Sequence, residues 1–424
     1  MSTREERGRI IAETQKLTQK GWLWHVPSQS GVGKYCVFPH KTEPKCDCPD
    51  FDNGFICKHI IAVQITMTRT TTQETSSDGT QTTTETVSMK ATAKRKTYQQ
   101  PSWPLYNASQ VHEHEHFHDL LADLCSTLPE PPRKPGRGRK PVTYRDGLFS
   151  AILKVYSLMS ARRFSGELQS AHERGFIEHL PHFNTVLGIF DNPHATPILR
   201  GMIEASALPL RAVEFDFATD STGFATQKYA SWFSHKYKKT RVNSQFVKAH
   251  FVTGVHTNIV TACNIEEQFT ADSPQLPALT EKTAESFTIR EMSADKAYAS
   301  QSNFEAVESL NAQFFPLFRR NTTGGIGGAF EKAFHYFSLH REEYLQHYHK
   351  RSNVESTVSM IKRKFGDSVK AKNDLAQKNE VYAKFVCHNI CVLIQEMYVQ
   401  GIEPILCTPK RNEARLHILK FPTE

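Results

Sequence analysis

The clearest periodic pattern of apolar positions lies near the end of the chain, in residues 348–366. Val354, Val358 and Ile361 recur there at spacings of four and three, and no Pro or Gly interrupts the segment before Gly366. These spacings are the period of an α-helix, and a glycine is well suited to end one. We therefore predict a helix that ends at Gly366.

The same segment carries a second, polar set at helical spacing: Tyr348, Arg351, Glu355 and Lys362. Successive members are three, four and seven residues apart, so all four side chains return to nearly the same face of a helix. Taken alone, this pattern is compatible with a solvated helix face that carries an ordinary Arg351–Glu355 ion pair.

Alternation of apolar and polar residues predicts strands upstream of this helix. Residues 212–224 alternate in this way, and we expect the strand to end at Asp220, before Ser-Thr-Gly. Asp216 shares the face of Asp220 and is the competing candidate for a functional carboxylate. Further strands are predicted over residues 245–256, 259–265, 289–295 and 313–319, the third of which ends in Asp295.

Three segments resemble motifs of one family, in the family's order. Asp220-Ser-Thr-Gly-Phe resembles the first-Asp motif of DDE transposases of the insertion-sequence family 4 type, and Ala-Asp295-Lys-Ala-Tyr resembles the second. Ala297 replaces the usual Gly, which keeps the position small. The helix set matches the family's Tyr-(2)-Arg-(3)-Glu-(6)-Lys signature in every residue and gap. The resemblance covers roughly residues 140–400.

The resemblance implies an α/β fold class. Its centre would be an RNase H-like catalytic core, a mixed sheet flanked by helices, preceded by a small zinc-binding domain and a helical segment. Asp220, Asp295 and Glu355 would be the catalytic carboxylates, which bind two Mg²⁺ ions.

The other members of the helix set would contact DNA. Arg351 and Lys362 would neutralise terminal phosphates, and Tyr348 would stack on an extruded base. The implied partners are the transposon terminal inverted repeats and the target DNA, bound by a homodimer.

A cluster of soft ligands lies near the N-terminus. Cys46-Asp-Cys48 and Cys57-Lys-His59 supply two close pairs that suit tetrahedral Zn²⁺, and Gly54 between them permits a chain reversal. The pattern resembles the SWIM zinc finger over roughly residues 20–65, and we interpret the zinc as structural because protein fills all four positions. A small core is expected from Trp22, Trp24, Phe51, Phe55 and Ile60.

Two biased segments follow the zinc ligands. Eleven of the twenty-one residues in 66–86 are Thr, which predicts a disordered linker, with an extended strand as the alternative. Further on, Arg137-Gly-Arg139 lies in a basic stretch and resembles an AT-hook that binds the minor groove, although Lys140 precedes the expected Pro. A basic linker that contacts phosphates nonspecifically is equally compatible.

Four histidines alternate with other residues in 111–118. On a strand they would share one face and could bind a metal, but the run leads into a helical pattern, so a solvated helix face is the default. Helical periodicity continues at residues 145–160, 165–174 and 183–190. These helices could bind DNA ends, mediate dimerisation or simply pack, and we assign no recognition helix.

Composition agrees with a DNA-binding protein. The chain has 52 Lys and Arg against 44 Asp and Glu, a net charge of +8, which favours a polyanionic partner. No signal peptide and no membrane-spanning apolar run is recognisable, and nine cysteines without a disulfide spacing favour a reducing compartment. We expect a cytoplasmic, nucleoid-associated protein of a prokaryotic host.

The predicted domains are a zinc finger, a linker, a basic arm with helices, a catalytic domain and a tail, over residues 1–65, 66–100, 101–210, 211–400 and 401–424. The predicted function is an active DDE transposase. The alternatives are a catalytically inactive zinc-finger DNA-binding descendant and, less favoured, an RNase H-like nuclease without strand transfer.

Overall fold

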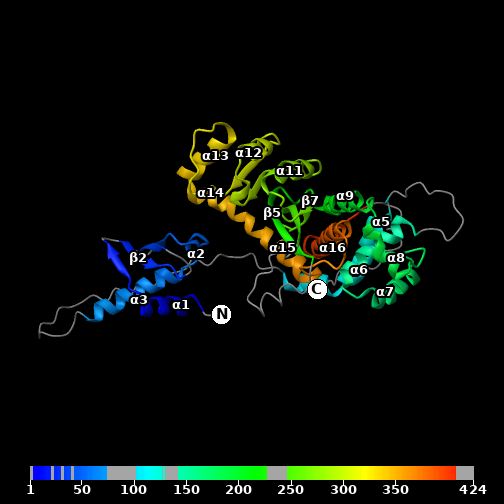
Figure 1. Ribbon diagram of the computed structural model, residues 1–424, viewed down its shortest axis with the longest axis horizontal. Coiled ribbons are helices and arrows are strands. Elements are labelled where there is room, and N and C mark those ends of the chain that lie inside the picture. The colour runs from blue at the N-terminus through cyan, green and yellow to red at the C-terminus, as the bar shows by residue number, and fades with distance from the viewer. Residues whose placement is uncertain are drawn as a thin grey trace, which may run out of the picture. The chain divides into compact units, whose positions relative to one another are not determined.

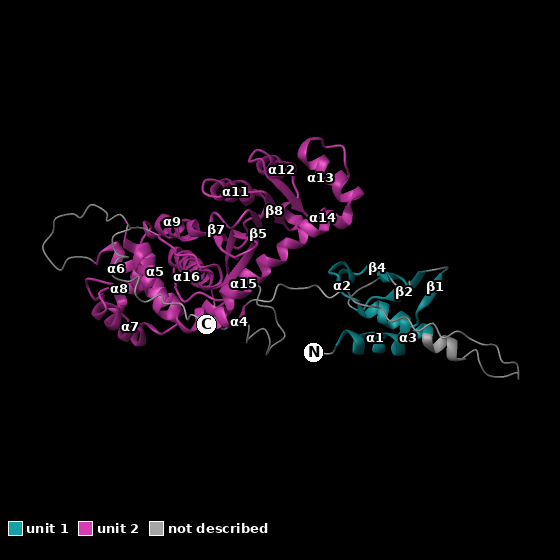
Figure 2. Cartoon of the chain, turned by 180° about the vertical axis from the view of Figure 1, so that it is seen from behind, with its two compact units in different colours: residues 1–100 teal, residues 101–424 magenta. Residues whose placement is uncertain are grey.

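The structure is a computed structural model that describes residues 3–20, 23–29, 33–39, 43–73, 102–126, 128, 142–226 and 246–406. The chain forms two compact units, residues 1–100 and residues 101–424 (Figure 2). No helix in the described ranges is both long enough and apolar enough to cross a membrane.

The first unit is a four-stranded antiparallel sheet with helices packed on it. Its elements are α1 Arg4–Thr14, β1 Thr18–Lys20, β2 Leu23–Pro27, β3 Lys34–Phe38, β4 Lys45–Cys46, α2 Pro49–Asp52 and α3 Lys58–Gln73. The strands follow the order β1-β2-β3-β4, and Trp24 and Val37 pair across β2 and β3 in the core. Ile11 and Ile60 complete this core from α1 and α3.

Two expectations for the first unit need correction. Phe55 is 40% exposed, and the Arg4 guanidinium lies 4.2 Å from its ring centre, so Phe55 is outside the core. Helix α3 continues to Gln73, so residues 66–73 are helical where a linker was predicted. The Thr66 hydroxyl donates to the Ala62 carbonyl, which lets this residue remain within a helix. Trp22 and residues 74–100 lie outside the described residues.

The second unit contains a five-stranded mixed sheet. Its strands are β5 Asp216–Ala225, β6 Phe246–Gly254, β7 Val260–Glu267, β8 Glu291–Ala294 and β9 Gln313–Pro316, in the order β7-β6-β5-β8-β9. β6 runs antiparallel to both neighbours, whereas β5, β8 and β9 are parallel. The mixed sheet confirms the predicted fold class.

The prediction that the first strand ends at Asp220 is wrong. β5 continues to Ala225 because β6 pairs with it along its whole length, from Phe217 to Ala225. Only the pairing with β8 stops near Asp220, since β8 ends at Ala294. At Asp220, therefore, β5 is still paired with β6 but no longer with β8.

Helices surround this sheet. They are α4 Trp103–Val111, α5 Glu113–Ser126, α6 Tyr144–Ser157, α7 Ala161–Glu173, α8 Phe183–Gly188, α9 Ala195–Ala207, α11 Leu276–Ala284, α12 Gln301–Glu308, α13 Gly328–Leu339, α14 Arg341–Tyr348, α15 Ser352–Phe365 and α16 Asp374–Gln400, with 3₁₀ turns η1 Ile189–Asp191, η2 Leu208–Leu210, η3 Ser273–Gln275, η4 Lys296–Tyr298 and η5 His349–Arg351. The helix predicted at 348–366 is confirmed, with η5 at its start and Gly366 ending it at a φ of 82°.

Helix α16 is the centre of the second unit. It packs against β7, α4, α5, α6 and α9, and Figure 1 shows it between the sheet and helices α5 and α6. Two of its side chains satisfy the outer edge of the sheet. Asn389 accepts a hydrogen bond from the Val260 amide and donates to the Val260 carbonyl, at 2.9 and 2.7 Å, and the Tyr382 hydroxyl accepts from the Ile265 amide. β7 therefore has partners where an edge strand would otherwise have none.

We expect Asn389→Leu to lower the free energy of unfolding by about 2–4 kcal/mol, because it leaves buried backbone groups of Val260 without partners. Chemical denaturation followed by circular dichroism measures this loss. Gln395→Leu, on a half-buried residue of the same helix, is the control and should change stability by less than about 1 kcal/mol. Equal effects of the two substitutions would contradict the role assigned to Asn389.

Candidate active site

Strand register places two of the predicted carboxylates side by side. Thr219 of β5 pairs with Ala294 of β8. Asp220 is the next residue of β5, and Asp295 directly follows the end of β8. The Asp220 carboxylate accepts from the Ser221 amide at 2.8 Å, and Asp295 accepts from the Lys296 amide at 2.7 Å. Both side chains are half-buried. Since β5 and β8 run parallel, both carboxylates lie at the same end of the sheet.

Arg351 connects Asp220 to the third carboxylate. Its Nη2 lies 2.7 Å from Asp220 Oδ2, and its Nη1 lies 3.1 Å from Glu355 Oε1. Glu355 is in the first turn of α15, and its side chain is 69% exposed. The guanidinium thus separates the helix carboxylate from the strand carboxylate. The described residues contain no arrangement in which all three carboxylates lie within 4.8 Å of one another.

The charges at this site are strongly coupled. Burial raises the pKa of Asp220 above its usual value, the Arg351 guanidinium opposes this shift, and the negative charge of Asp295 adds to it. Burial acts to lower the pKa of Arg351, but the charge of Asp220, with those of Asp295 and Glu355, raises it overall. A cation at this position is therefore stabilised by the surrounding carboxylates.

Two other predicted DNA contacts, Tyr348 and Lys362, lie on α14 and α15. Tyr348 is half-buried at the end of α14, and burial raises the pKa of its hydroxyl. The Lys362 ammonium lies 5.4 Å from the ring centre of Phe224, which is four residues beyond Asp220 on β5. Burial lowers the pKa of Lys362. Arg137 and Arg139 lie outside the described residues.

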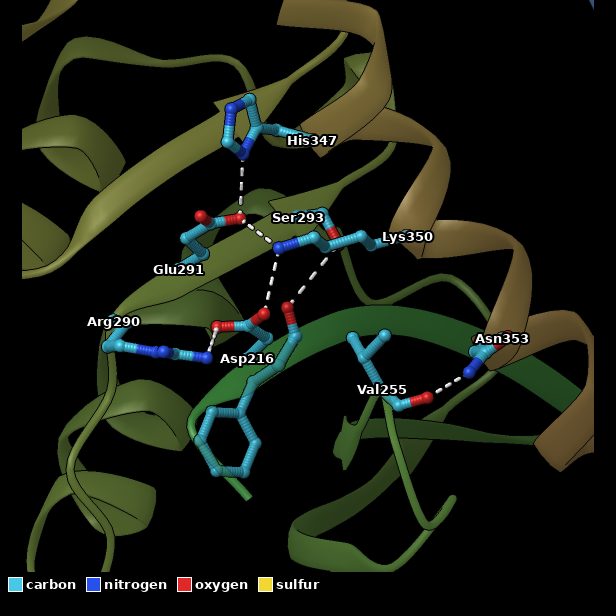
Figure 3. A network of polar contacts seen from close by, with 9 residues as sticks. Asp216, Val255, Arg290, Glu291, Ser293, His347, Lys350 and Asn353 are labelled. Carbon is cyan, nitrogen blue, oxygen red and sulfur yellow. Dashed lines mark hydrogen bonds and ion pairs between the residues drawn. The ribbon is translucent and has the colours of Figure 1, made fainter. Parts of the chain in front are cut away.

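A second acidic pair, Asp216 and Glu291, lies four residues before Asp220 and Asp295. The two residues pair directly across β5 and β8. Lys350 reaches both, with its Nζ 2.8 Å from Asp216 and 2.6 Å from Glu291 (Figure 3). Arg290 also contacts Asp216, and His347 contacts Glu291, at 3.1 and 2.9 Å. Asp216, the competing candidate, is therefore occupied by cations of the protein itself.

This second acidic pair positions the helix that carries Glu355. Lys350 lies in η5, directly before Arg351, so its two ion pairs anchor the turn against the sheet. Asn353 strengthens the attachment by donating to the Val255 carbonyl (Figure 3). In the sequence Lys350 is one of several cations near Arg351 and carries no spacing signal of its own. Its partners lie 134 and 59 residues away in the chain, so no local spacing could have identified the contact.

The predicted zinc ligands converge in the first unit. Sγ atoms of Cys46, Cys48 and Cys57 and a ring nitrogen of His59 lie within 4.8 Å of one another, and all four residues are buried. Cys46 Sγ and His59 Nδ1 are 4.0 Å apart. Cys46 ends β4, Cys48 precedes α2, and the other two flank the start of α3.

The local chain makes this convergence possible. Gly54, between the two pairs, adopts a φ of +79°, a left-handed conformation that permits the reversal. Hydrogen bonds from Cys46 and then Cys57 lower the pKa of the Cys48 thiol, whereas hydrogen bonds from Cys48 and then Cys57 raise the pKa of Cys46. Three sulfurs and one imidazole nitrogen in a closed, buried set fit a tetrahedral structural zinc ion.

The two sites differ in the metals they suit. Carboxylate oxygens at the sheet fit a hard divalent cation, whereas the thiols and imidazole of the first unit fit zinc. The carboxylates come from elements far apart in the chain, whereas the zinc ligands all lie within residues 46–59.

Comparison with known protein families agrees with both sites. Residues 216–390 match the family described as transposase DDE domain, and residues 34–65 match the SWIM zinc finger. The first match begins at Asp216, the first residue of β5, and includes the strands and α15. A search of curated proteins found no match. The chain therefore carries an N-terminal SWIM zinc finger followed by a transposase DDE domain with an RNase H-like core.

Proposed function

We propose that the protein is an active DNA transposase of the insertion-sequence family 4 type, which cleaves DNA at transposon ends and joins them to target DNA. The observation that carries the proposal is the adjacent placement of Asp220 and Asp295, with Glu355 linked to Asp220 through Arg351. The three carboxylates argue against the alternative, an inactive DNA-binding descendant.

The carboxylates provide the ligands for the chemistry. Two Mg²⁺ ions, held by Asp220 together with Asp295 and Glu355, would activate the attacking hydroxyl and stabilise the leaving oxygen. The protein's own contribution is to hold these side chains at one end of the sheet. Arg351, which pairs with Asp220 and Glu355, is in position to bind a terminal phosphate once those carboxylates have other partners.

Only some of the cations in residues 350–364 are suited to bind DNA. Lys350 pairs with Asp216 and Glu291, and Lys364 pairs with the buried Glu113, so these cations neutralise the protein itself. The phosphate contacts other than that of Arg351 then fall to Lys362 and the exposed Arg363 on α15, with Tyr348 stacking on a displaced base.

The remaining parts of the proposal concern assembly and location. Arg137 and Arg139 would contact the minor groove, and the helices ahead of the sheet would bind the terminal repeats or mediate a homodimer. The zinc finger binds DNA or protein through a surface that its zinc ion stabilises. The site of action is the DNA of a prokaryotic cytoplasm.

We expect Asp220→Asn, Asp295→Asn and Glu355→Gln each to reduce excision by at least about a thousandfold, because each removes a charged metal ligand. The assay uses a donor plasmid that carries a marker between the gene's own flanking sequences. Glu308→Gln is the control, since Glu308 is an exposed carboxylate paired only with the exposed Lys332 among the described contacts. Excision by the three variants at the wild-type level would show that other residues are catalytic.

Arg351→Gln should have opposite effects on metal binding and on excision. Removing the guanidinium removes a cation that competes for Asp220 and Glu355, so we expect Mn²⁺ to bind roughly tenfold more tightly, equivalent to about 1.4 kcal/mol. Excision should fall at least about tenfold because the phosphate loses its partner. Electron paramagnetic resonance titration measures the Mn²⁺ affinity.

The matched control for this experiment is Arg363→Gln, which removes an exposed cation from α15, the helix that directly follows Arg351. Its Mn²⁺ affinity should equal that of the wild type. A wild-type Mn²⁺ affinity in Arg351→Gln as well would disprove the competition between Arg351 and the metal.

Loss of zinc should unfold the first unit selectively. Structural zinc contributes on the order of 10 kcal/mol of binding energy at pH 7, more than a small core supplies. We therefore expect Cys57→Ser to lose zinc and to become sensitive to protease within residues 3–65, while residues 246–400 stay resistant. Cys36→Ser, in the same sheet but outside the ligand cluster, is the control. Retained protease resistance in Cys57→Ser would exclude a folding role for zinc.

A further inference from the structure

The alternating histidines form two separate pairs on the helical segment that begins at His112. His112 and His116 face α16, where the His112 ring is parallel to that of Tyr398 and His116 Nε2 lies 3.0 Å from the Tyr398 hydroxyl. His114 and His118 face the other way, towards α7. Residues two positions apart point to nearly opposite sides of a helix, so the alternation produces two pairs at a spacing of four.

The second pair meets a carboxylate. Ring nitrogens of His114 and His118 and a carboxylate oxygen of Glu167 lie within 4.8 Å of one another, and His114 Nε2 is 3.7 Å from Glu167 Oε2. Ligands of a tetrahedral zinc ion are separated by about 3.4 Å, given bonds of roughly 2.0–2.1 Å. Small rotations of the His114 and Glu167 side chains would close that difference.

The helix backbone fixes the tautomer of the neutral His118 ring. Its Nδ1 donates a hydrogen bond to the His114 carbonyl at 2.7 Å, which leaves the proton off Nε2. The ring is 2% exposed and packs near Phe149 and Phe176, so its orientation is held by neighbouring side chains. An ion pair between His114 and Glu167 would explain their contact, but it would not involve His118, which is buried beside them.

We propose that His114, His118 and Glu167 form a second site for a divalent transition-metal ion, of which zinc is the best-fitting example. Two imidazoles and one carboxylate suit zinc and its first-row neighbours better than Mg²⁺ or Ca²⁺. The negative charge of Glu167 opposes the effect of the Arg174 guanidinium, which lowers the pKa of His118.

The metal at this site would link two helices that both pack on α6. Three protein ligands leave one coordination position, and the His114 side chain is 60% exposed, so water completes the shell. The adjacent residue, Glu113, pairs with Lys364 of α15. The same end of α5 therefore contacts the helix that carries Glu355, and the ion would make this end of α5 more rigid.

The test is the zinc content of the full chain. Protein is dialysed to equilibrium against buffered free zinc with excess Mg²⁺, and bound zinc is measured by atomic emission. We expect the wild type to bind one zinc ion more than Glu167→Gln or His114→Gln, because the Cys46 cluster is intact in all three. His112→Gln, also exposed and also four residues from a second histidine, is the control and should bind as much zinc as the wild type.

Cobalt identifies which site is lost. The Co²⁺ difference spectrum between wild type and Glu167→Gln should contain ligand-field bands without the thiolate charge-transfer absorption of the cysteine cluster. Equal zinc content in the wild type and both variants would overturn the proposal, and so would equal loss in His112→Gln. Neither readout depends on transposition, so the result is independent of the proposed catalytic activity.

Discussion

The parallel pairing of β5 with β8 is the constraint on which the candidate active site depends. It sets acidic residues opposite one another at two levels, Asp216 with Glu291 and, four residues later, Asp220 beside Asp295. Four carboxylates on adjacent strands would repel one another strongly in a partly buried setting. Cations held against both levels offset this repulsion.

Two consecutive residues of η5 supply those cations. Lys350 binds the first level, at Asp216 and Glu291, and Arg351 binds Asp220 at the second level and extends to Glu355. The two contacts differ in consequence. The Lys350 contact anchors η5, because Asp216 and Glu291 are also paired with Arg290 and His347. The Arg351 contact involves carboxylates that suit a metal ion. In η5, therefore, a lysine that anchors the turn is followed directly by an arginine whose carboxylate partners can bind a metal instead.

Helix α16 then holds the rest of the site in place. Lys384 donates to the carbonyls of Gly366 and Ser368, at 2.9 and 2.7 Å, and so binds the chain just beyond the end of α15. Burial lowers the pKa of Lys384 to about 8, so the ammonium is still largely charged at neutral pH. Through Asn389 the same helix also satisfies the outer edge of the sheet. One buried helix thus fixes both the sheet and the segment that carries Glu355.

The sequence by itself determined the local elements and the sets of ligand residues. Helical spacing identified the segment from Tyr348 to its end at Gly366, and the paired spacing of Cys46 to His59 identified the zinc ligands, because both signals repeat over a few residues. Tertiary structure alone decided the rest. The extension of β5 past Asp220, the occupation of Asp216 by Lys350 and the meeting of His114 with Glu167 all depend on partners in other elements, and no local period encodes such contacts.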